Sequence, residues 1–337
     1  MKIIVDAFGG DNAPESNVRG SVTAVNLNED LEVILVGDEA KIKAELEKVG
    51  YTGDRISIVH APDVITNDDV PTAAIRAKKE SSLVVALDML KNDESIVGMV
   101  SAGSTGAVLT GATLKIGRLD GVLRPTMSAI LTSEKNKEVF IVDAGATVDA
   151  KPEYLVQYAK MGNIFMSGLT GKDCPKIGLL SVGTEDHKGS EFSKAVFELL
   201  KAEKDLDFVG NIEGRDILSG DVDVVVTDGF SGNIALKSIE AGVGFAMHNL
   251  KEAIKNGGIG AKIGYLFLKK SLKKTIAKVD YRNYGGAPFL GVKKLVVKAH
   301  GSSNAKSIYA SILQVKRMQE FGLTEKMSKV FSGENNE

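Results

Sequence analysis

The chain has 337 residues, and 43% of them are hydrophobic, which supports a sizeable core and excludes a disordered chain. Its 42 basic and 44 acidic residues give a formal charge of −2, which argues against a general nucleic-acid binder. The single cysteine, Cys174, excludes a disulfide scaffold and any thiolate cluster for zinc or iron–sulfur.

Short apolar runs alternate with helical patterns along the first half of the chain. We expect buried parallel strands at 3–5, 33–36, 56–59, 96–100 and 140–142. The segments between them are long enough for crossover helices, expected at 14–26, 38–48, 71–91 and 104–115.

The same alternation resumes in the second half. Strands are expected at 177–181, 222–227 and 295–298, and helices at 152–167, 188–202, 232–255 and 303–320. This pattern predicts an α/β fold with a doubly wound, mostly parallel sheet. We expect one domain over 1–331, which could divide into two lobes, with a projecting basic and apolar helical element at about 255–278 and a flexible tail at 332–337.

One segment departs from the charge of the rest. Residues 251–280 hold eight lysines and two acids, a net charge of +6 on a body of −8. Two apolar stripes would form on opposite sides of a helix here, at 265, 268, 272 and 276 and at 259, 263, 266 and 267. Two interpretations stay open: a core helix with a solvated lysine edge, or a projecting element whose faces meet a partner subunit and an anionic surface.

Glycine is unusually frequent, with 36 glycines among the 337 residues. In an average protein glycine makes up about 7% of the residues. Many glycines follow predicted strands, where backbone N–H groups can approach a ligand and helix N-termini add donors. The alternative is that they make the tight turns of any α/β protein. The candidates for a phosphate cradle are Ser101, Gly103, Ser104, Thr105, Gly106, Ser302, Ser303, Asn304 and Lys306.

Several common motifs are missing from the sequence. It has no G-x-G-x-x-G after a strand, no Walker-type loop and no G-x-S-x-G elbow, so dinucleotide binding, a Walker-type ATPase and a serine hydrolase are unsupported. The four histidines show no metal-ligand spacing, and no cofactor is expected. His187 and His300 are stronger functional candidates than His60 and His248.

Seven stretches taken together carry a family pattern. They are VDAFGGDNAPE at 5–15, SAGSTGA at 101–107, DAGATVDAKPEYLVQYAKMG at 143–162, VGNIEGRDIL at 209–218, DVVVTDGFSGNIALK at 223–237, YRNYGGAPFLGV at 281–292 and KAHGSSNAK at 298–306. Over nearly its whole length the chain therefore resembles the acyl-ACP:phosphate acyltransferases of bacterial phospholipid synthesis, the PlsX family. It departs from that family at Asn12, where histidine is usual, at Thr147, where asparagine is usual, and at Ser104, which is often asparagine.

The resemblance implies a reaction in which acyl-ACP and inorganic phosphate give acyl phosphate and free acyl carrier protein. It also implies a homodimer with a Rossmann-like α/β/α sandwich, related to phosphotransacetylases and isopropylmalate-type dehydrogenases, and association with the inner face of the membrane. A thioester is already activated, so direct attack by phosphate needs positioning and oxyanion stabilisation but no covalent enzyme nucleophile. This agrees with the weak case for Cys174 as a nucleophile.

Three side chains are candidates for that chemistry. Lys188, in a glycine-flanked loop that opens a helix, could meet phosphate or the oxyanion. Asn233 could donate to the thioester oxygen, or it could cap a helix that starts at 234. His300 could protonate the leaving thiolate or hold phosphate. Three carboxylates end predicted strands, namely Asp6, Asp143 and Asp228. One of them could orient Lys188, whereas at least two are expected to form turns. Asp228 is also a candidate for the substrate site.

The basic segment gains two possible partners from the resemblance. Its lysines could guide an acidic carrier protein or face anionic lipid, and its apolar side chains could insert shallowly into a membrane. The residues concerned are Tyr265, Leu266, Phe267, Leu268, Lys269, Lys270, Lys273 and Lys274.

No apolar run approaches the roughly 18 residues needed to cross a bilayer, and only three apolar residues precede Asp6 after the first lysine. We therefore expect a cytoplasmic protein that is peripherally membrane-associated. The rival functions are a phosphotransacetylase that uses short acyl-CoA and a non-catalytic membrane or carrier-protein scaffold. A NAD-dependent dehydrogenase is suggested by fold analogy alone.

Overall fold

The computed structural model describes residues 1–279 and 285–333, without the side chains of 273–274 and 276–279. These residues contain an 11-stranded sheet. In chain order its strands are β1 (Lys2–Asp6), β2 (Glu32–Gly37), β3 (Ile56–His60), β4 (Ile96–Ser101), β5 (Thr126–Thr132), β6 (Glu138–Val142), β7 (Lys176–Leu180), β8 (Asp207–Ile212), β9 (Val224–Val226), β10 (Ala287–Leu290) and β11 (Leu295–Lys298).

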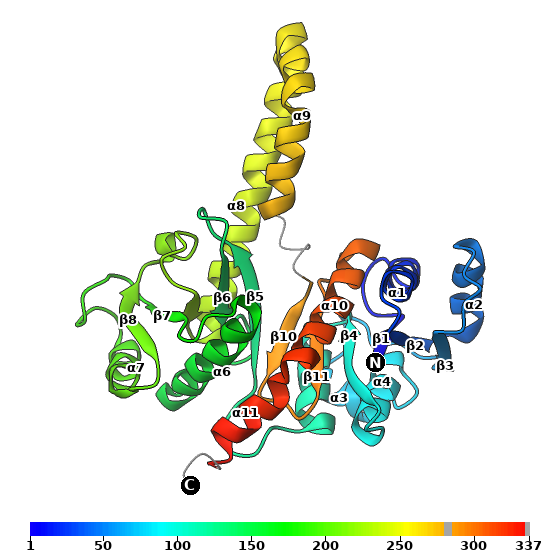
Figure 1. Cartoon of the computed structure of the whole chain (residues 1–337), viewed down its shortest axis with the longest axis horizontal. Helices are drawn as coiled ribbons and strands as arrows, with labels where there is room; N and C mark the ends of the chain where they lie inside the picture. Colours follow the sequence, from blue (N-terminus) through cyan, green and yellow to red (C-terminus); the bar gives the residue numbers. More distant parts are fainter. Residues whose placement is uncertain (280–284, 334–337) are drawn as a thin grey trace.

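The sheet consists of two parallel blocks with an antiparallel junction between them. The strand order is β3-β2-β1-β4-β11-β10-β5-β6-β9-β7-β8. The first block, β3-β2-β1-β4-β11, is parallel throughout. The second block, β6-β9-β7-β8, is parallel as well. Strand β10 is antiparallel to both β11 and β5, and β5 is antiparallel to β6. Figure 1 shows one block on each side of β10. The predicted doubly wound, mostly parallel α/β fold is confirmed.

Helices cover both faces of the sheet, which is why its strands are nearly continuous apolar runs. One apolar core joins the sheet to the first, sixth, seventh, tenth and eleventh helices, and a second core joins it to the third, fourth and fifth and to the inner end of the eighth. The helices are α1 (Glu15–Leu27), α2 (Glu39–Lys48), α3 (Pro71–Ala77), α4 (Ser82–Asn92), α5 (Thr105–Gly111), α6 (Pro152–Thr170), α7 (Glu191–Ala202), α8 (Gly229–Asn256), α9 (Gly258–Val279), α10 (Ala305–Phe321) and α11 (Leu323–Phe331).

Strands β5, β8 and β10 and helix α11 are not predicted by the sequence pattern. In β5 the polar Ser128 interrupts the apolar run, yet it is buried because its Oγ donates to the carbonyl of Pro288, 3.0 Å away. Strand β10 contains that proline, which argues against a strand when read locally. The helix predicted at 71–91 is divided into α3 and α4, because Ser81 caps a new helix by accepting from the N–H of Val84 at 3.4 Å. The helix predicted at 104–115 is α5 followed by a π-helical turn, Ala112–Ile116.

Helices α8 and α9 form a hairpin that projects from the sheet (Figure 1). The 28 residues of α8 span about 42 Å. Apolar side chains on α9 are exposed, with Ile259 at 78%, Leu266 at 69% and Phe267 at 84%. The interpretation of this segment as a core helix is therefore wrong, because α9 packs mainly on α8 and leaves its other sides to solvent.

Gly232 anchors the first turn of α8 against the end of β6. A Cβ at this position would lie 1.9 Å from the backbone oxygen of Asp143, a contact that no side-chain motion relieves. Gly232→Ala is therefore expected to lower the free energy of unfolding by about 3 kcal/mol. Urea denaturation measures this, with Gly242→Ala as the matched control, since a Cβ at Gly242 meets nothing within 4 Å. Equal effects of the two substitutions would contradict the prediction.

Candidate active site

A cavity of about 340 Å³ opens where strands from both blocks of the sheet end beside α8. Thr105 follows β4, Ala144 and Gly145 follow β6, and Lys298 ends β11 and is followed by Ala299 and His300. The first turns of α8 complete the wall. The lining residues are Thr105, Met127, Ala129, Ile130, Leu131, Ala144, Gly145, Asn233, Leu236, Lys237, Glu240, Gly285, Gly286, Ala287, Lys298, Ala299 and His300.

Three of the predicted site residues meet in this cavity, namely Asn233, His300 and Thr105. Asn233 does not cap its helix, because α8 begins at Gly229 and the Asp228 carboxylate accepts from the N–H of Ser231 at 2.8 Å. The side chain of Asn233 is exposed and has no hydrogen-bond partner among the residues that the structure describes. Its amide is thus available to a ligand.

Gly145 lets Asn233 come close to the end of β6. A Cβ on Gly145, whose φ is +135°, would lie 3.4 Å from the Cβ of Asn233. Asp143, two residues earlier, accepts from the N–H groups of Gly145, Ala146 and Thr147 at 2.7–2.9 Å. Burial raises the pKa of Asp143, and these three donors oppose that shift. Asp143 therefore shapes the turn that lines the cavity.

Lys298 is the residue that the sequence analysis overlooked. It ends β11, between β4 and β10, and the residue is buried, with 7% of its surface exposed. Its Nζ donates to the carbonyl oxygens of Ala299 and Ala102, the latter at 3.5 Å, and among the described residues no carboxylate forms an ion pair with it. Burial lowers the pKa of Lys298 to about 8, and the charge of Asp6 partly opposes this. A lysine closing an otherwise apolar strand was the signal that could have revealed it.

Because its ammonium group is buried, Lys298 is expected to make the stability of the fold depend on pH. Below pH 8 Lys298 is charged in both the folded and the unfolded chain, so the full cost of burying its charge is present. As pH rises from about 8 toward the unfolded value near 10.4, the folded chain binds fewer protons and that cost disappears. The melting temperature of Lys298→Met should therefore exceed that of the parent most below pH 8, and the gap should narrow by pH 10. A gap independent of pH in phosphate-free buffer would contradict this.

Asp6 and Ser101 form a buried pair behind Lys298. The Oγ of Ser101 donates to the Asp6 carboxylate at 2.7 Å and accepts from the N–H of Gly103 at 3.1 Å. Burial raises the pKa of Asp6. The hydroxyl of Ser101, a predicted phosphate ligand, is thus occupied within the protein. Gly9 permits this packing, because a Cβ there would lie 2.6 Å from the backbone nitrogen of Gly103.

His300 is held by the loop that follows it. Its Nδ1 accepts from the backbone N–H of Ser302 at 3.2 Å and lies 2.9 Å from the Oγ of the same residue. A neutral imidazole with an acceptor at Nδ1 carries its proton on Nε2. Burial lowers the pKa of His300, and Lys237 and Lys298 lower it further, so the neutral form is favoured.

The loop at 302–304 is hydrogen-bonded to the loop between β1 and α1. The Asn12 Nδ2 donates to the carbonyls of Ser302 and Ser303 at 3.2 and 3.1 Å, so this departure from the family pattern keeps a structural contact. Asn304 caps α10 by accepting from the N–H of Ser307 at 3.0 Å. Thr147, the second departure, accepts from the hydroxyl of Tyr158 at 3.1 Å.

The remaining predicted residues lie elsewhere. Lys188 is exposed in the loop between β7 and α7 and does not line the cavity, so its catalytic role stays a prediction. Ser104 precedes α5 without a side-chain cap, and Gly103 and Gly106 flank it. Lys306 lines a second cavity along α10. On α9, Leu266, Phe267, Leu268, Lys269 and Lys270 are exposed and Tyr265 is half-buried, whereas the side chains of Lys273 and Lys274 lie outside the described residues.

Two kinds of feature are absent from residues 1–279 and 285–333. No group of histidine, cysteine or acidic side chains there could hold a metal ion. None of the helices in the same ranges is long and apolar enough to cross a membrane.

Comparison with known proteins supplies the family. A family model described as "Fatty acid synthesis protein" matches residues 1–326. A phosphate acyltransferase of Clostridium acetobutylicum is 46% identical over 329 residues, covering 98% of each chain. Another, from Clostridium botulinum, is 44% identical over 335 residues, covering 99% of this chain and all of the relative.

Solved structures supply the fold. A phosphotransacetylase from Streptococcus pyogenes matches with a TM-score of 0.63 and 18% identity, covering 95% of this chain and 94% of the other. The EutD phosphotransacetylase of Staphylococcus aureus matches with a TM-score of 0.59 and 15% identity over the same shares. The predicted likeness to the phosphotransacetylase fold is confirmed.

Proposed function

Because this chain belongs to the phosphate acyltransferase family, we propose that it transfers a long-chain fatty acyl group from acyl carrier protein to inorganic phosphate. The products are acyl phosphate for phospholipid synthesis and free carrier protein. The observation that carries this proposal is the buried Lys298, which forms no ion pair with a carboxylate among the described residues and lies in a cavity that also holds Asn233 and His300. Burying a cation without a carboxylate partner costs free energy, which a bound phosphate would recover.

In this proposal phosphate lies against the ammonium of Lys298 and the hydroxyl of Thr105. One phosphate oxygen attacks the thioester carbonyl carbon, and the Asn233 amide donates to the oxygen that becomes negative. The C–S bond then breaks, and the electron pair leaves with sulfur. The proton of hydrogen phosphate ends on that sulfur, with His300 at the cavity wall as the group that hydrogen-bonds the leaving thiolate. No covalent enzyme intermediate forms.

Purified protein, palmitoyl-ACP and labelled inorganic phosphate test the proposal, with acyl phosphate trapped by hydroxylamine. We expect phosphate-dependent formation of acyl phosphate. No product with any long-chain acyl-ACP would overturn it. Full activity of Lys188→Ala would reject a role for Lys188 and leave the reaction standing.

The likeness to phosphotransacetylases favours one rival reaction, phosphate acylation by a short acyl-CoA. The same anion site would serve both reactions, so the acyl donor is the discriminator. Parallel assays with acetyl-CoA and palmitoyl-ACP separate them, and a higher kcat/KM for acetyl-CoA would favour the rival.

The second part of the proposal concerns the projecting hairpin of α8 and α9. We propose that the protein is a homodimer, and that this hairpin docks the acidic carrier protein and contacts anionic lipid. Its outer apolar side chains and the exposed Lys269 and Lys270 match an interfacial surface. Leu266→Glu/Phe267→Glu is expected to abolish flotation with vesicles that contain phosphatidylglycerol. Leu27→Glu, an exposed leucine on α1, is the control. Unchanged flotation of the double variant would reject the lipid contact.

A further inference from the structure

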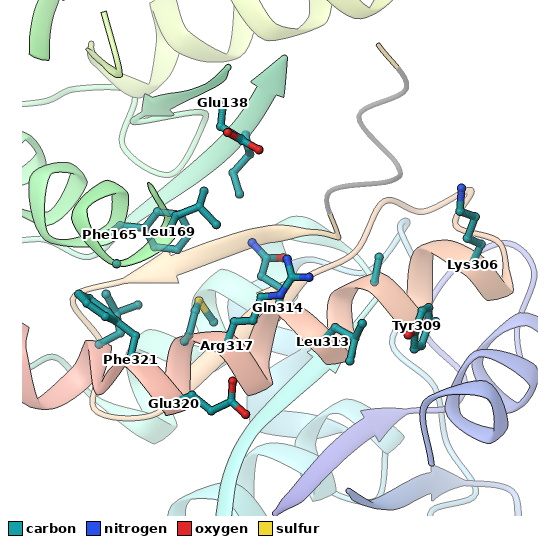
Figure 2. Close-up of a pocket in the computed structure, with 15 residues that line it drawn as sticks. Glu138, Phe165, Leu169, Lys306, Tyr309, Leu313, Gln314, Arg317, Glu320 and Phe321 are labelled. Atoms are coloured by element: carbon teal, nitrogen blue, oxygen red, sulfur yellow. The ribbon is translucent and has the colours of Figure 1, made fainter. Parts of the chain in front are cut away.

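A second and larger cavity of about 680 Å³ lies between α10 and α6, and nothing above assigns it a ligand (Figure 2). Figure 2 shows Phe165 and Leu169 of α6 facing helix α10, which carries Leu313 and Phe321. Its lining is mainly apolar, and its charged members are of both signs, so it has no preference for an anion. The chemistry of this groove suits a hydrocarbon.

The groove runs along one face of α10. Lining residues recur every three to four positions along the helix, from Lys306 through Ala310 and Leu313 to Phe321. The stretch from Ala310 to Phe321 alone covers about 16 Å. At the far end Phe321 packs on α6, where a Cβ on Gly168 would lie 2.4 Å from its ring. An extended chain therefore fits the groove better than a compact molecule.

The groove adjoins the candidate active site. Ile130 of β5 lines both cavities. Gly285 and Gly286 line the active-site cavity, and the N–H of Gly286 donates to the Oε1 of Gln314, a groove residue, at 2.9 Å. Strand β10 pairs with β5 only at Thr126 and Met127. Gly285 and Gly286, which precede β10 and connect the wall of the active-site cavity to Gln314 of the groove, are called the glycine partition.

Gln314 leaves one hydrogen-bonding group at this junction unused. The residue is 7% exposed, and its Nε2 has no hydrogen-bond partner among the described residues. A buried amide donor without an acceptor costs free energy, which a carbonyl at the head of a bound chain would recover.

We infer that the groove along α10 holds the hydrocarbon chain of the acyl donor and of the acyl phosphate product, with the reacting carbonyl at the glycine partition. This rests on the proposed function, since it requires an acyl substrate in the adjoining cavity. The groove then sets the acyl-chain preference, because each methylene that it buries adds to the binding of long chains.

Blocking the middle of the groove tests the inference. Leu313→Trp adds bulk at a half-buried position where the fold has room, and Leu199→Trp on the exposed face of α7 is the matched control. We expect Leu313→Trp to lose at least about tenfold in kcat/KM for palmitoyl-ACP and to keep octanoyl-ACP turnover within about threefold of the parent. The control should keep the parent profile.

A second readout does not depend on turnover. A palmitate analogue with a photoreactive group at its methyl end is expected to label peptides of α6 or the end of α10 in the parent, and Leu313→Trp should lose that labelling.

The outcomes separate the two proposals. An equal loss for both chain lengths, or labelling elsewhere, overturns the groove inference even when the parent makes acyl phosphate. A parent inactive with all acyl-ACPs overturns the proposed function instead. Conversion of a dimer to a monomer by Leu313→Trp in light scattering would assign the groove to a second copy of the chain and overturn the inference as well.

Discussion

Replacing Lys298 with methionine is expected to lower kcat/KM for phosphate by about 10²- to 10³-fold and at the same time to stabilise the fold. The activity falls because the cavity loses its buried cation. The stability rises, by about 1 kcal/mol or more, because methionine fills a similar volume without a charge that has no ion-pair partner among the described residues. Steady-state kinetics at varied phosphate and thermal melting at pH 7 measure the two effects.

The control for this variant is Lys293→Met, because Lys293 is an exposed lysine just before β11 that pairs with Asp120. It should leave both quantities close to the parent values. A Lys298→Met protein that melts lower and loses activity in proportion would indicate a structural lysine. If Lys298→Met keeps the phosphate affinity of the parent, phosphate binds elsewhere, and Lys188 becomes the stronger candidate for its ligand.

Asn233→Ala should lower kcat by about 10²- to 10³-fold with little change in KM for the acyl donor. The amide has no partner in the described structure and faces the cavity, so its interaction would form with the developing oxyanion rather than with the protein. Folding should be unaffected, since the side chain is exposed and Asp228, not Asn233, caps α8.

Asn249→Ala is the matched control for this second variant, an asparagine farther along α8 whose Nδ2 donates to the carbonyl of Phe245 within its own helix. It should keep the parent kcat. If Asn233→Ala raises KM and leaves kcat unchanged, Asn233 binds the ground state and the oxyanion donor must be another group.

Individual strands show which parts of the fold the local sequence pattern predicts and which it does not. The runs at 3–5 and 295–298 are short and mostly apolar, which predicts strands, and both are strands. Strand β5 was missed because Ser128 is polar, and its hydroxyl is satisfied by Pro288, which lies 160 residues away. A partner at that separation leaves no trace in a local window.

The candidate site divides in the same way. His300 and Asn233 stand in turns after predicted strands, so they could be named from the sequence. Lys298 was missed although it stands two residues before His300, because its importance comes from burial between β4 and β10. Ser101 was expected to bind phosphate, yet it donates to Asp6, which is 95 residues away in sequence at the end of the neighbouring strand β1.

The sequence by itself determined the α/β class, the glycine-rich strand ends and the family, because these depend on residue order and short-range periodicity. Only the tertiary structure decided which strand ends face one cavity, which lysine is buried and which apolar residues on α9 remain exposed. The physical reason is that burial and charge pairing are set by contacts between distant segments. The net charge of −2 therefore does not reveal two cationic features of the molecule. One is Lys298, buried at the end of β11, and the other is the group of exposed lysines on the hairpin.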